Sequence, residues 1–306
     1  MSSPKTISWS TAKDKFQNFL FIVPAVAIFA VFYIFPFYYI FHLSLHEWDG
    51  ISFQKHFIWF DNFKDLLQDK IWWSSLWHAG YITLIALTFQ NAFAFLLALA
   101  CDREIKMKRF YRVVFFIPVV LSEVVVGLLW KWILDAGNQN GEPIGLLNYM
   151  LIKSGFPHLV HAWLSEPQTA LTCIAVVHSW KGFGWGFIML LAGLQTIDRQ
   201  LYEAARVDGA GSWSVFRHVT IPNMLPVIVV VMILTILGSM QVFVLILSMV
   251  SQGLAFHTEV PVTRILAAMT STREYGYACA QGVTFGIILV AFSFILKQMS
   301  NRVKQA

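Results

Sequence analysis

The sequence predicts an all-helical integral membrane protein with six transmembrane helices. Hydrophobic residues make up 57% of the 306 residues and charged residues only 13%, whereas a soluble domain carries about 25% charged residues. A soluble chain of this length would need more charge to cover its surface. The apolar runs also reach the length of about 20 residues that a helix needs to cross the hydrocarbon core of a bilayer.

The first apolar run is too long for a signal peptide, whose apolar region has about 7–15 residues followed by small residues at a cleavage site. It ends in bulky residues, so we expect it to remain as the first span. The six-helix domain is predicted to cover residues 19–299, between tails at residues 1–18 and 300–306. The six predicted spans are Phe19–Leu43, Leu76–Cys101, Tyr111–Leu134, Ala170–Ile197, Leu225–Val250 and Tyr275–Met299.

The distribution of Lys and Arg predicts the orientation of these spans. Fourteen of these residues lie in the tails and in the loops after the second and fourth spans, and seven lie in the other loops. Loops rich in Lys and Arg stay in the cytoplasm. Both termini and the loop at residues 198–224 are therefore predicted to be cytoplasmic, and the run Arg103–Arg112 is the strongest part of this signal. The loops at residues 46–73 and 135–167 then face outward.

Two charged residues fall within predicted spans. Glu123 lies near the middle of the third span and Lys181 near the middle of the fourth. A charge at the bilayer centre costs at least about 2.5–3.5 kcal/mol on insertion scales, so each side chain is expected to face protein or water. Their similar depth and opposite signs predict an ion pair across adjacent helices. The pair either fixes the register of two helices or lines the path of a transported solute, and the sequence leaves both readings open.

Other polar residues are expected at a comparable depth, and one aromatic residue lies among them. His178 precedes Lys181 by three residues and shares its helix face. A ring beside mixed hydrogen-bond donors and acceptors suits a sugar, which has apolar CH faces and hydroxyl edges. A buried Lys181 also leaves room for an acidic sugar or a glycerol phosphate. The candidate residues of the solute path are Gln90, Asn91, Glu123, His178, Trp180, Lys181 and Gln241.

Motifs for enzyme chemistry are absent from the sequence. It has no GxxxxGK[ST] phosphate-binding loop, no HExxH and no GxSxG. Its three cysteines, Cys101, Cys173 and Cys279, form no CxxC pair and no metal-ligand spacing, so we read them as buried apolar residues. The pI near 9.1 does not indicate nucleic-acid binding, because the basic residues cluster at the ends of the spans. We therefore expect no catalytic site, no bound metal and no cofactor in this chain.

The cytoplasmic loop at residues 198–224 has the composition of a compact two-part helical element. Ala204 and Ala205 allow a helix to pack closely into a groove, and Glu203 offers a carboxylate to a partner. Asp208 and Gly209 are expected to turn the chain, because glycine adopts positive φ without strain. Ser212 is a candidate cap for a second helix, on which Trp213 and Phe216 share a face. Pro222 and Pro226 mark the return into the fifth span.

This loop resembles the signature of inner-membrane permeases of binding-protein-dependent ABC importers, in the sugar-transport branch. The signature is Glu-Ala-Ala, three residues and Gly, followed by an Ile/Leu-Pro segment, and it stands here as Glu203 to Gly209 with Ile221-Pro222. The resemblance runs from about Phe16 to Arg302, with one departure at Ser251–Leu254. Further matching segments are Leu191–Ile197, Phe116–Pro118, Val124–Trp130 and Tyr275–Ala278.

The resemblance implies the type I ABC importer permease fold, a mechanism and a set of partners. In such permeases the Glu-Ala-Ala loop forms a short helix in a cleft of a cytoplasmic ATPase subunit, which binds ATP and Mg²⁺ and moves the spans. The implied partners are a second homologous permease as a heterodimer, two ATP-binding subunits, an extracytoplasmic solute-binding protein and a sugar or oligosaccharide. The implied location is the bacterial inner membrane. The implied coupling residues are Glu203, Ala204, Ala205, Asp208, Gly209, Phe216 and Pro222.

Two other classes of function remain as alternatives at this stage. In a proton-coupled secondary transporter, Glu123, Lys181 and His178 would form a proton relay. Such transporters are usually built from inverted repeats with broken helices at the midplane, and no internal repeat relates the two halves of this sequence. A purely structural membrane subunit would not explain the specific cytoplasmic loop.

Overall fold

The computed structural model describes residues 12–102, 106–137, 145–250 and 257–305. The departure at Ser251–Leu254 and residues 103–105 of the basic run lie outside these ranges. The described chain is helical except for its connecting segments and one two-stranded antiparallel ladder, β1 (His46–Glu47) with β2 (His56–Phe57). The chain divides into two compact units, Met1–Leu67 with Ala268–Val283, and Gln68–Ala267 with Thr284–Ala306.

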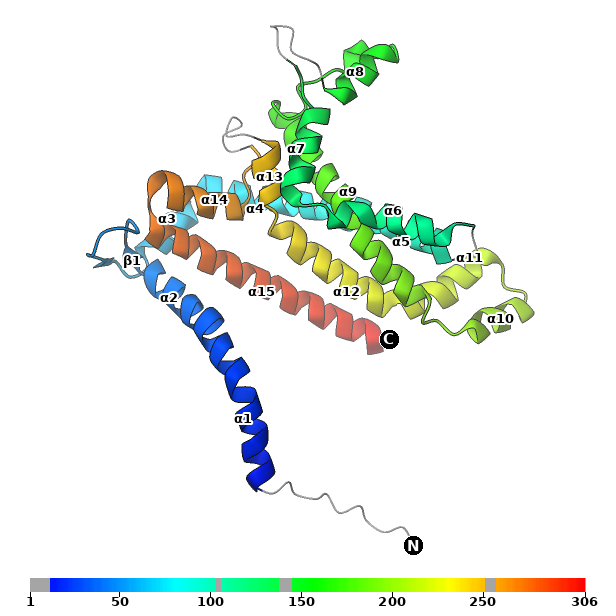
Figure 1. The fold of residues 1–306 in the computed structure, drawn as a ribbon, viewed down its shortest axis with the longest axis horizontal. Helices are drawn as coiled ribbons and strands as arrows, with labels where there is room; N and C mark the ends of the chain where they lie inside the picture. Colours follow the sequence, from blue (N-terminus) through cyan, green and yellow to red (C-terminus); the bar gives the residue numbers. More distant parts are fainter. Residues whose placement is uncertain (1–11, 103–105, 138–144, 251–256, 306) are drawn as a thin grey trace. The chain divides into compact units, whose positions relative to one another are not determined.

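The first unit begins with one long apolar helix that leads into a small cap around β1 and α3 (Figure 1). The helix runs through α1 (Ala12–Phe29), a π-helical turn η1 (Ala30–Ile34) and α2 (Phe35–Ser44). The cap holds the β-ladder and α3 (Asp61–Gln68). Asn62 of α3 is buried and donates hydrogen bonds to the carbonyl oxygens of Ser44 and His46, at 2.9 and 3.0 Å. These bonds fix the cap to the end of the first span.

The second unit is built around α9 (Pro167–Leu194), which is the most buried of the spanning helices. Phe183, Phe187 and Leu190 of α9 are buried in a core that also contains Ala94 and Met224. The helices that surround it begin with α4 (Lys70–Ile85), η2 (Ala86–Gln90) and α5 (Asn91–Asp102), which form the second span. The next helices are α6 (Lys108–Val120), α7 (Glu123–Ile133), α8 (Leu146–Lys153) and the short 3₁₀ turn η3 (Pro157–Leu159).

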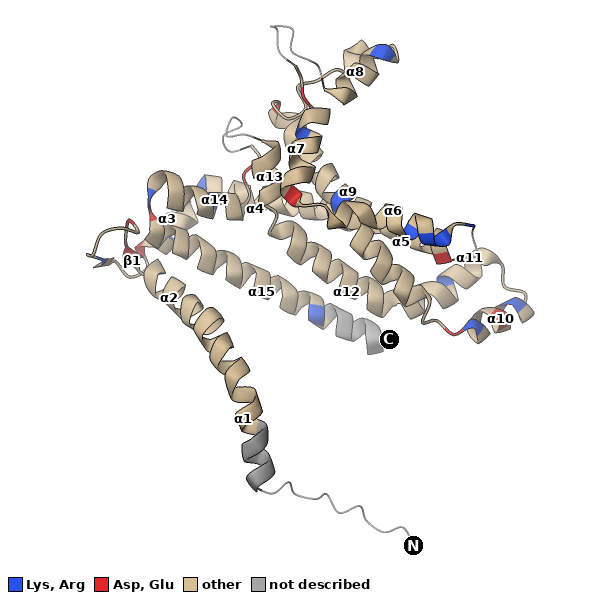
Figure 2. Ribbon diagram, viewed as in Figure 1, with Lys and Arg blue, Asp and Glu red and all other residues tan. Residues whose placement is uncertain are grey.

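The remaining helices follow α9 along the chain. The long spans among them carry little charge, and the charged residues gather near helix ends and connections (Figure 2). α12 contains no charged residue at all. These helices are α10 (Arg199–Val207), α11 (Ser212–Val215), η4 (Phe216–Thr220), α12 (Ile221–Met240), α13 (Val244–Met249), α14 (Pro261–Ala267), η5 (Ala268–Thr272) and α15 (Tyr275–Gln305).

The described residues contain five helices long and apolar enough to cross a membrane, and a sixth span if a bent pair is counted as one. The predicted third span, Tyr111–Leu134, is not one continuous helix, because α6 and α7 meet at an angle of 94°. Leu121 and Ser122 are both extended, with ψ of 139° and 141°, so they interrupt the helix. The predicted fifth span also differs, since its helix begins at Ser212, ends at Met240 and resumes as α13 at Val244.

Close approach of α6 to α9 requires a glycine. A Cβ at Gly184 would lie 2.4 Å from the carbonyl oxygen of Phe115, which is backbone and cannot move aside. Gly184→Ala is expected to destabilise the protein by about 1–3 kcal/mol, since it overpacks this interface. The matched control is Gly238→Ala at an exposed position of α12, where nothing lies within 4 Å of an added Cβ. Thermal unfolding of the purified complex compares the two, and equal unfolding temperatures would contradict the assigned packing.

Candidate functional site

The element predicted to be cytoplasmic, at residues 198–224, begins with α10, a short helix that is exposed along its length. Asp198 caps it by accepting a hydrogen bond from the Gln200 backbone N–H at 2.9 Å. No residue of α10 is buried. Glu203 and Ala204 are exposed, and Ala205 is half-buried. The helix therefore presents its Glu-Ala-Ala face to the surroundings.

The turn after α10 lies where it was predicted, at Asp208 and Gly209. Asp208 follows the last helical residue, and its backbone N–H bonds to the Ala204 carbonyl at 3.0 Å. Gly209 has φ of +75°, in the left-handed region that glycine adopts most easily. Ala210 then donates to the Ala205 carbonyl at 2.9 Å. This pattern of bonds is a Schellman motif, and it ends α10 sharply.

The second part of the element is continuous with the fifth span. The N-cap of α11 is Gly211, so the prediction that Ser212 caps this helix was wrong, and Ser212 is its first residue. From Ser212 the helix passes through η4 into α12. Pro222 lies directly after η4 inside this continuous helix, where its missing N–H removes one backbone hydrogen bond. A force applied to α11 thus acts directly on the end of a spanning helix.

Two sets of contacts hold the parts of this element together and against α5. The Tyr202 hydroxyl lies 3.3 Å from the Thr220 hydroxyl and connects α10 to η4. The Phe216 ring lies 5.5 Å from Trp213, which confirms their shared face, and 6.2 Å from Phe95 of α5. The Tyr202–Thr220 contact could not be predicted from local sequence patterns, because these residues are separated by the whole turn.

The charged pair within the spans is formed as predicted, but in a different backbone context. Glu123 Oε1 lies 3.9 Å from Lys181 Nζ. Glu123 is not in the middle of a helix, because it opens α7 directly after the break at Ser122. There its carboxylate interacts favourably with the positive end of the helix dipole. Its side chain is 40% exposed, against 17% for Lys181. A carboxylate this exposed at membrane depth must face water or another protein, since lipid would not solvate it.

An aromatic pair lies beside the charged pair. The Trp130 ring of α7 and the Trp180 ring of α9 meet edge to face, with centroids 5.5 Å apart. Trp180 directly precedes Lys181. The sequence favoured Trp130 as an interfacial residue, so its part in this pair was missed. The bend between α6 and α7 sets the direction of α7, which brings Trp130 to Trp180.

The remaining candidates of the solute path lie in different environments. Gln90 and Asn91 are buried between helices, at 2% and 9% exposure. The Asn91 Oδ1 accepts a hydrogen bond from Thr235 at 3.1 Å, and Gln90 packs over the α9 backbone at Gly182. The structure therefore places these two side chains in a helix interface. Gln241 is exposed at the end of α12, and His178 is partly buried one turn before Lys181.

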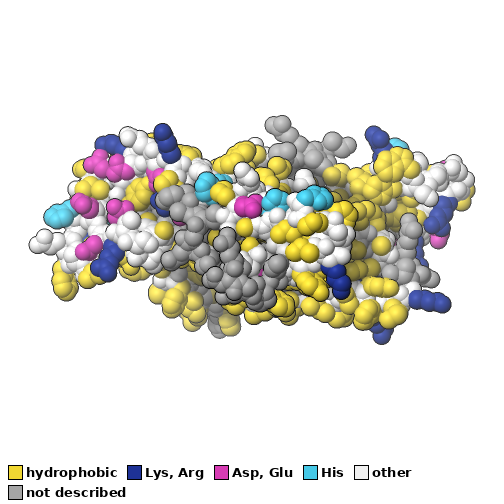
Figure 3. All heavy atoms as spheres, turned by 90° about the horizontal axis from the view of Figure 1, so that it is seen from above, with side chains coloured by type: hydrophobic (Ala, Val, Ile, Leu, Met, Phe, Trp, Pro, Cys, Tyr) yellow, Lys and Arg dark blue, Asp and Glu magenta, His cyan; other side chains and the backbone are white. Residues whose placement is uncertain are grey.

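The end of the first unit that holds the β-ladder, predicted to face outward, has an acidic cleft of about 570 Å³. Figure 3 shows acidic side chains gathered over this region, at the left of the view. The backbone N–H groups of Ser52 and Ile51 donate to the Asp49 carboxylate and lower its pKa to about 2. Asp49 therefore stays negatively charged at any physiological pH. The charged residues of the cleft are Glu47, Asp49, Asp61, Asp65, Arg273 and Glu274.

The long apolar helices, the exposed cytoplasmic helix and the charged pair within the spans define a membrane transport permease. Residues 90–305 match the family model described as "Binding-protein-dependent transport system inner membrane component". The chain belongs to this family of ABC transporter permeases, and it is a multi-pass protein of the inner membrane. It is thus the membrane component of its transporter and not the ATPase.

Similar proteins cover nearly the whole chain. The probable ABC transporter permease YurN of Bacillus subtilis (strain 168) is 31% identical over 92% of this chain and 95% of its own length. The diacetylchitobiose uptake permease NgcF of Streptomyces coelicolor is 28% identical over 92% and 82%. A crystal structure of a bacterial alginate ABC transporter with a pentasaccharide-bound periplasmic protein has a chain with a TM-score of 0.80. That chain is 23% identical, over 97% of this chain and 98% of its own, and it confirms the type I importer permease fold.

A double-mutant cycle on the charged pair measures how much it stabilises the fold. Glu123→Gln, Lys181→Gln and the double variant are expected to give a coupling free energy below about 1 kcal/mol. The reason is that the atoms are 3.9 Å apart and Glu123 is substantially exposed. Thermal unfolding of the complex supplies the four values. A coupling of about 3 kcal/mol or more would instead identify the pair as a structural lock between α7 and α9.

Proposed function

We propose that this permease imports a neutral sugar or oligosaccharide, with energy from ATP hydrolysis in two separate cytoplasmic subunits. The relatives support the substrate class, because their names assign them diacetylchitobiose, lactose and arabinooligosaccharides. The observation that supports an external energy source is the exposure of α10, which has no buried residue. Its Glu-Ala-Ala face is therefore accessible to an ATPase subunit. ATP and Mg²⁺ belong to the partner ATPase in this proposal.

The coupling step is proposed to begin at α10. Glu203 would pair with basic residues of an ATPase groove, while Ala204 and Ala205 allow the two backbones to approach. Closure of the ATPase dimer on ATP would then move α10, and the Tyr202–Thr220 contact would carry the movement to η4. Because η4 continues into α12, the displacement would reach the break after Met240 near the outer half of the fifth span.

The solute path is proposed to pass the charged pair and the tryptophan pair. Glu123 would accept hydrogen bonds from sugar hydroxyls and Lys181 would donate to them, while Trp180 would stack on a CH face of the ring. The ion pair favours a neutral sugar over an acidic sugar or glycerol phosphate, because the Lys181 charge is already compensated. Gln90, Asn91, His178 and Gln241 would contribute only where helix movement opens their surroundings.

The assembly is proposed to contain a second homologous permease, two ATPase subunits and an extracytoplasmic solute-binding protein. The family description requires a binding protein for the transport system as a whole. The acidic cleft is the proposed docking region on this chain. A binding protein that presents Lys or Arg side chains there would gain association rate from charge complementarity.

The turn after α10 provides a test of coupling. Gly209→Ala places a Cβ at φ of +75°, whereas Gly211→Ala changes a residue with φ of −69° and open space around it. Gly209→Ala and Glu203→Lys are each expected to lower solute-stimulated ATP hydrolysis at least about tenfold, equivalent to about 1.4 kcal/mol. Gly211→Ala is the matched control. Normal coupling in both test variants, with normal membrane insertion, would refute the role of this element.

The aromatic pair provides a test of the solute path. Trp180→Ala is expected to raise the KM for uptake about tenfold, because stacking of the indole ring on a sugar CH face is lost together with its apolar contact area. Trp132→Ala is the control, since Trp132 is 65% exposed on the same helix as Trp130. Uptake of labelled sugars by proteoliposomes with the binding protein gives both values. Unchanged uptake in both Trp180→Ala and Gln241→Ala would rule out a sugar-binding pocket at this depth.

A further inference from the structure

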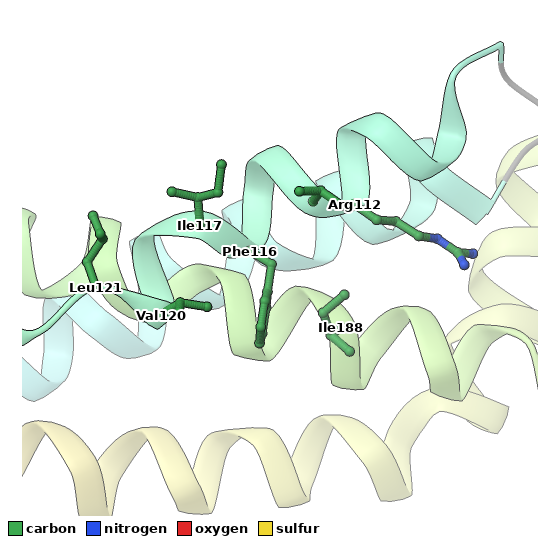
Figure 4. Close-up of a pocket in the computed structure, with 7 residues that line it drawn as sticks. Arg112, Phe116, Ile117, Val120, Leu121 and Ile188 are labelled. Atoms are coloured by element: carbon green, nitrogen blue, oxygen red, sulfur yellow. The ribbon is translucent and has the colours of Figure 1, made fainter.

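An apolar groove of about 490 Å³ lies along α6 where this helix passes α9 (Figure 4). It belongs entirely to the second unit and takes no part in the coupling element or the charged pair. Five of the residues labelled in Figure 4 are apolar, and the sixth is an arginine at one end. These residues are Arg112, Phe116, Ile117, Val120, Leu121 and Ile188.

The size and exposure of the groove suit a single acyl chain. Ile117 is 49% exposed and Val120 is 71% exposed, so the groove is open along its side. From Arg112 to Leu121 the helix rises about 13 Å, at about 1.5 Å per residue. In a bilayer an open apolar concavity of this length fills with hydrocarbon, because water has no hydrogen-bond partners there.

The positive charge of Arg112 at one end of the groove determines how a bound ligand would be oriented. The Arg112 Nε is buried and makes no hydrogen bond within the described residues. Lys108 and Arg109 precede Arg112 by four and three residues, so all three side chains share one helix face. The described residues include no acid in an ion pair with Arg112. The positive-inside distribution places this end of α6 at the level of the cytoplasmic headgroups. The anion available to Arg112 there is the phosphate of a lipid headgroup.

We propose that this groove is a binding site for an anionic phospholipid of the cytoplasmic leaflet. One acyl chain lies along Phe116, Ile117 and Val120, and the headgroup phosphate binds Arg112 with help from Lys108 and Arg109. Charge complementarity selects an anionic lipid over a zwitterionic one, since no acid among the described residues forms an ion pair with Lys108, Arg109 or Arg112. A transmembrane helix of another subunit would fill the apolar part but would leave Arg112 without an anion.

A lipid in this groove would also contact the break between α6 and α7, and through it could affect transport. Leu121 lines the groove and is also the first residue of the break between α6 and α7. A bound chain therefore contacts the segment that sets the direction of α7 and the position of Glu123. Bound lipid would favour the bent arrangement in which α6 stays packed on α9.

Lipid binding by the intact, delipidated transporter complex tests the proposal. Native mass spectrometry during titration with phosphatidylglycerol or phosphatidylcholine is expected to show preferential retention of phosphatidylglycerol. Arg112→Gln is expected to weaken that retention about fivefold, which corresponds to about 1 kcal/mol per basic residue at the membrane surface. Arg217→Gln removes an exposed arginine outside the groove and is expected to leave this lipid retention unchanged. Equal retention of both lipids, or an equal loss in both variants, would overturn the site.

Photocrosslinking in native membranes identifies the occupant of the groove directly. A benzoylphenylalanine that replaces Val120 is expected to form an adduct with the mass of a phospholipid. A crosslink to another polypeptide would overturn the proposal and assign the groove to a subunit interface. Ile117→Trp, which fills the groove but keeps Arg112, is expected to reduce phosphatidylglycerol retention as well, so the result does not depend on one variant that could misfold.

Discussion

Close packing against α9 is the constraint on which the second unit depends. Between helices in a bilayer there is little hydrophobic driving force, so association relies on van der Waals contact between closely spaced backbones. Gly184 allows α6 to approach until the Phe115 carbonyl lies over the position of its missing Cβ. Ala94 and Ala98 of α5 are buried in the same core. Because α5 and α6 cover this face of α9, Trp180 and Lys181 are left to contact α7.

The break at Leu121 and Ser122 follows from that packing and shapes the polar layer. α6 stays against α9, while α7 turns by 94° and packs on α13. The bend gives Glu123 the first position of a helix, where the dipole stabilises its carboxylate. It also directs the Trp130 ring to Trp180. One interruption of the backbone thus assembles the charged pair and the aromatic pair, and it lies at the end of the proposed lipid groove.

The cytoplasmic element is suited to transmit force because its two parts differ in attachment. α10 is exposed and ends at a glycine turn, so it can be held by a partner without disturbing the core. α11 is the beginning of the longest continuous part of the fifth span. A helix is stiff along its axis, so a displacement at this end is carried toward the break after Met240.

Composition and local pattern were sufficient to determine the membrane class, the approximate spans and the cytoplasmic loop, because apolar length and basic residues act through the bilayer itself. The turn at Gly209 was also predictable, since it depends on the φ of one residue. Depth and opposite sign were enough to pair Glu123 with Lys181. Several other features were decided by the tertiary structure alone.

The bend in the third span is the clearest of these, because the sequence stays apolar through Leu121 and hydropathy carries no information on backbone direction. Burial of Gln90 and Asn91 in a helix interface, away from an open path, depends on which faces of α5, α9 and α12 meet. The Tyr202–Thr220 contact joins residues that only the folded turn brings together. The length of the apolar runs is enough to predict which segments form spanning helices. Which side chains form a site depends on how those helices pack against one another.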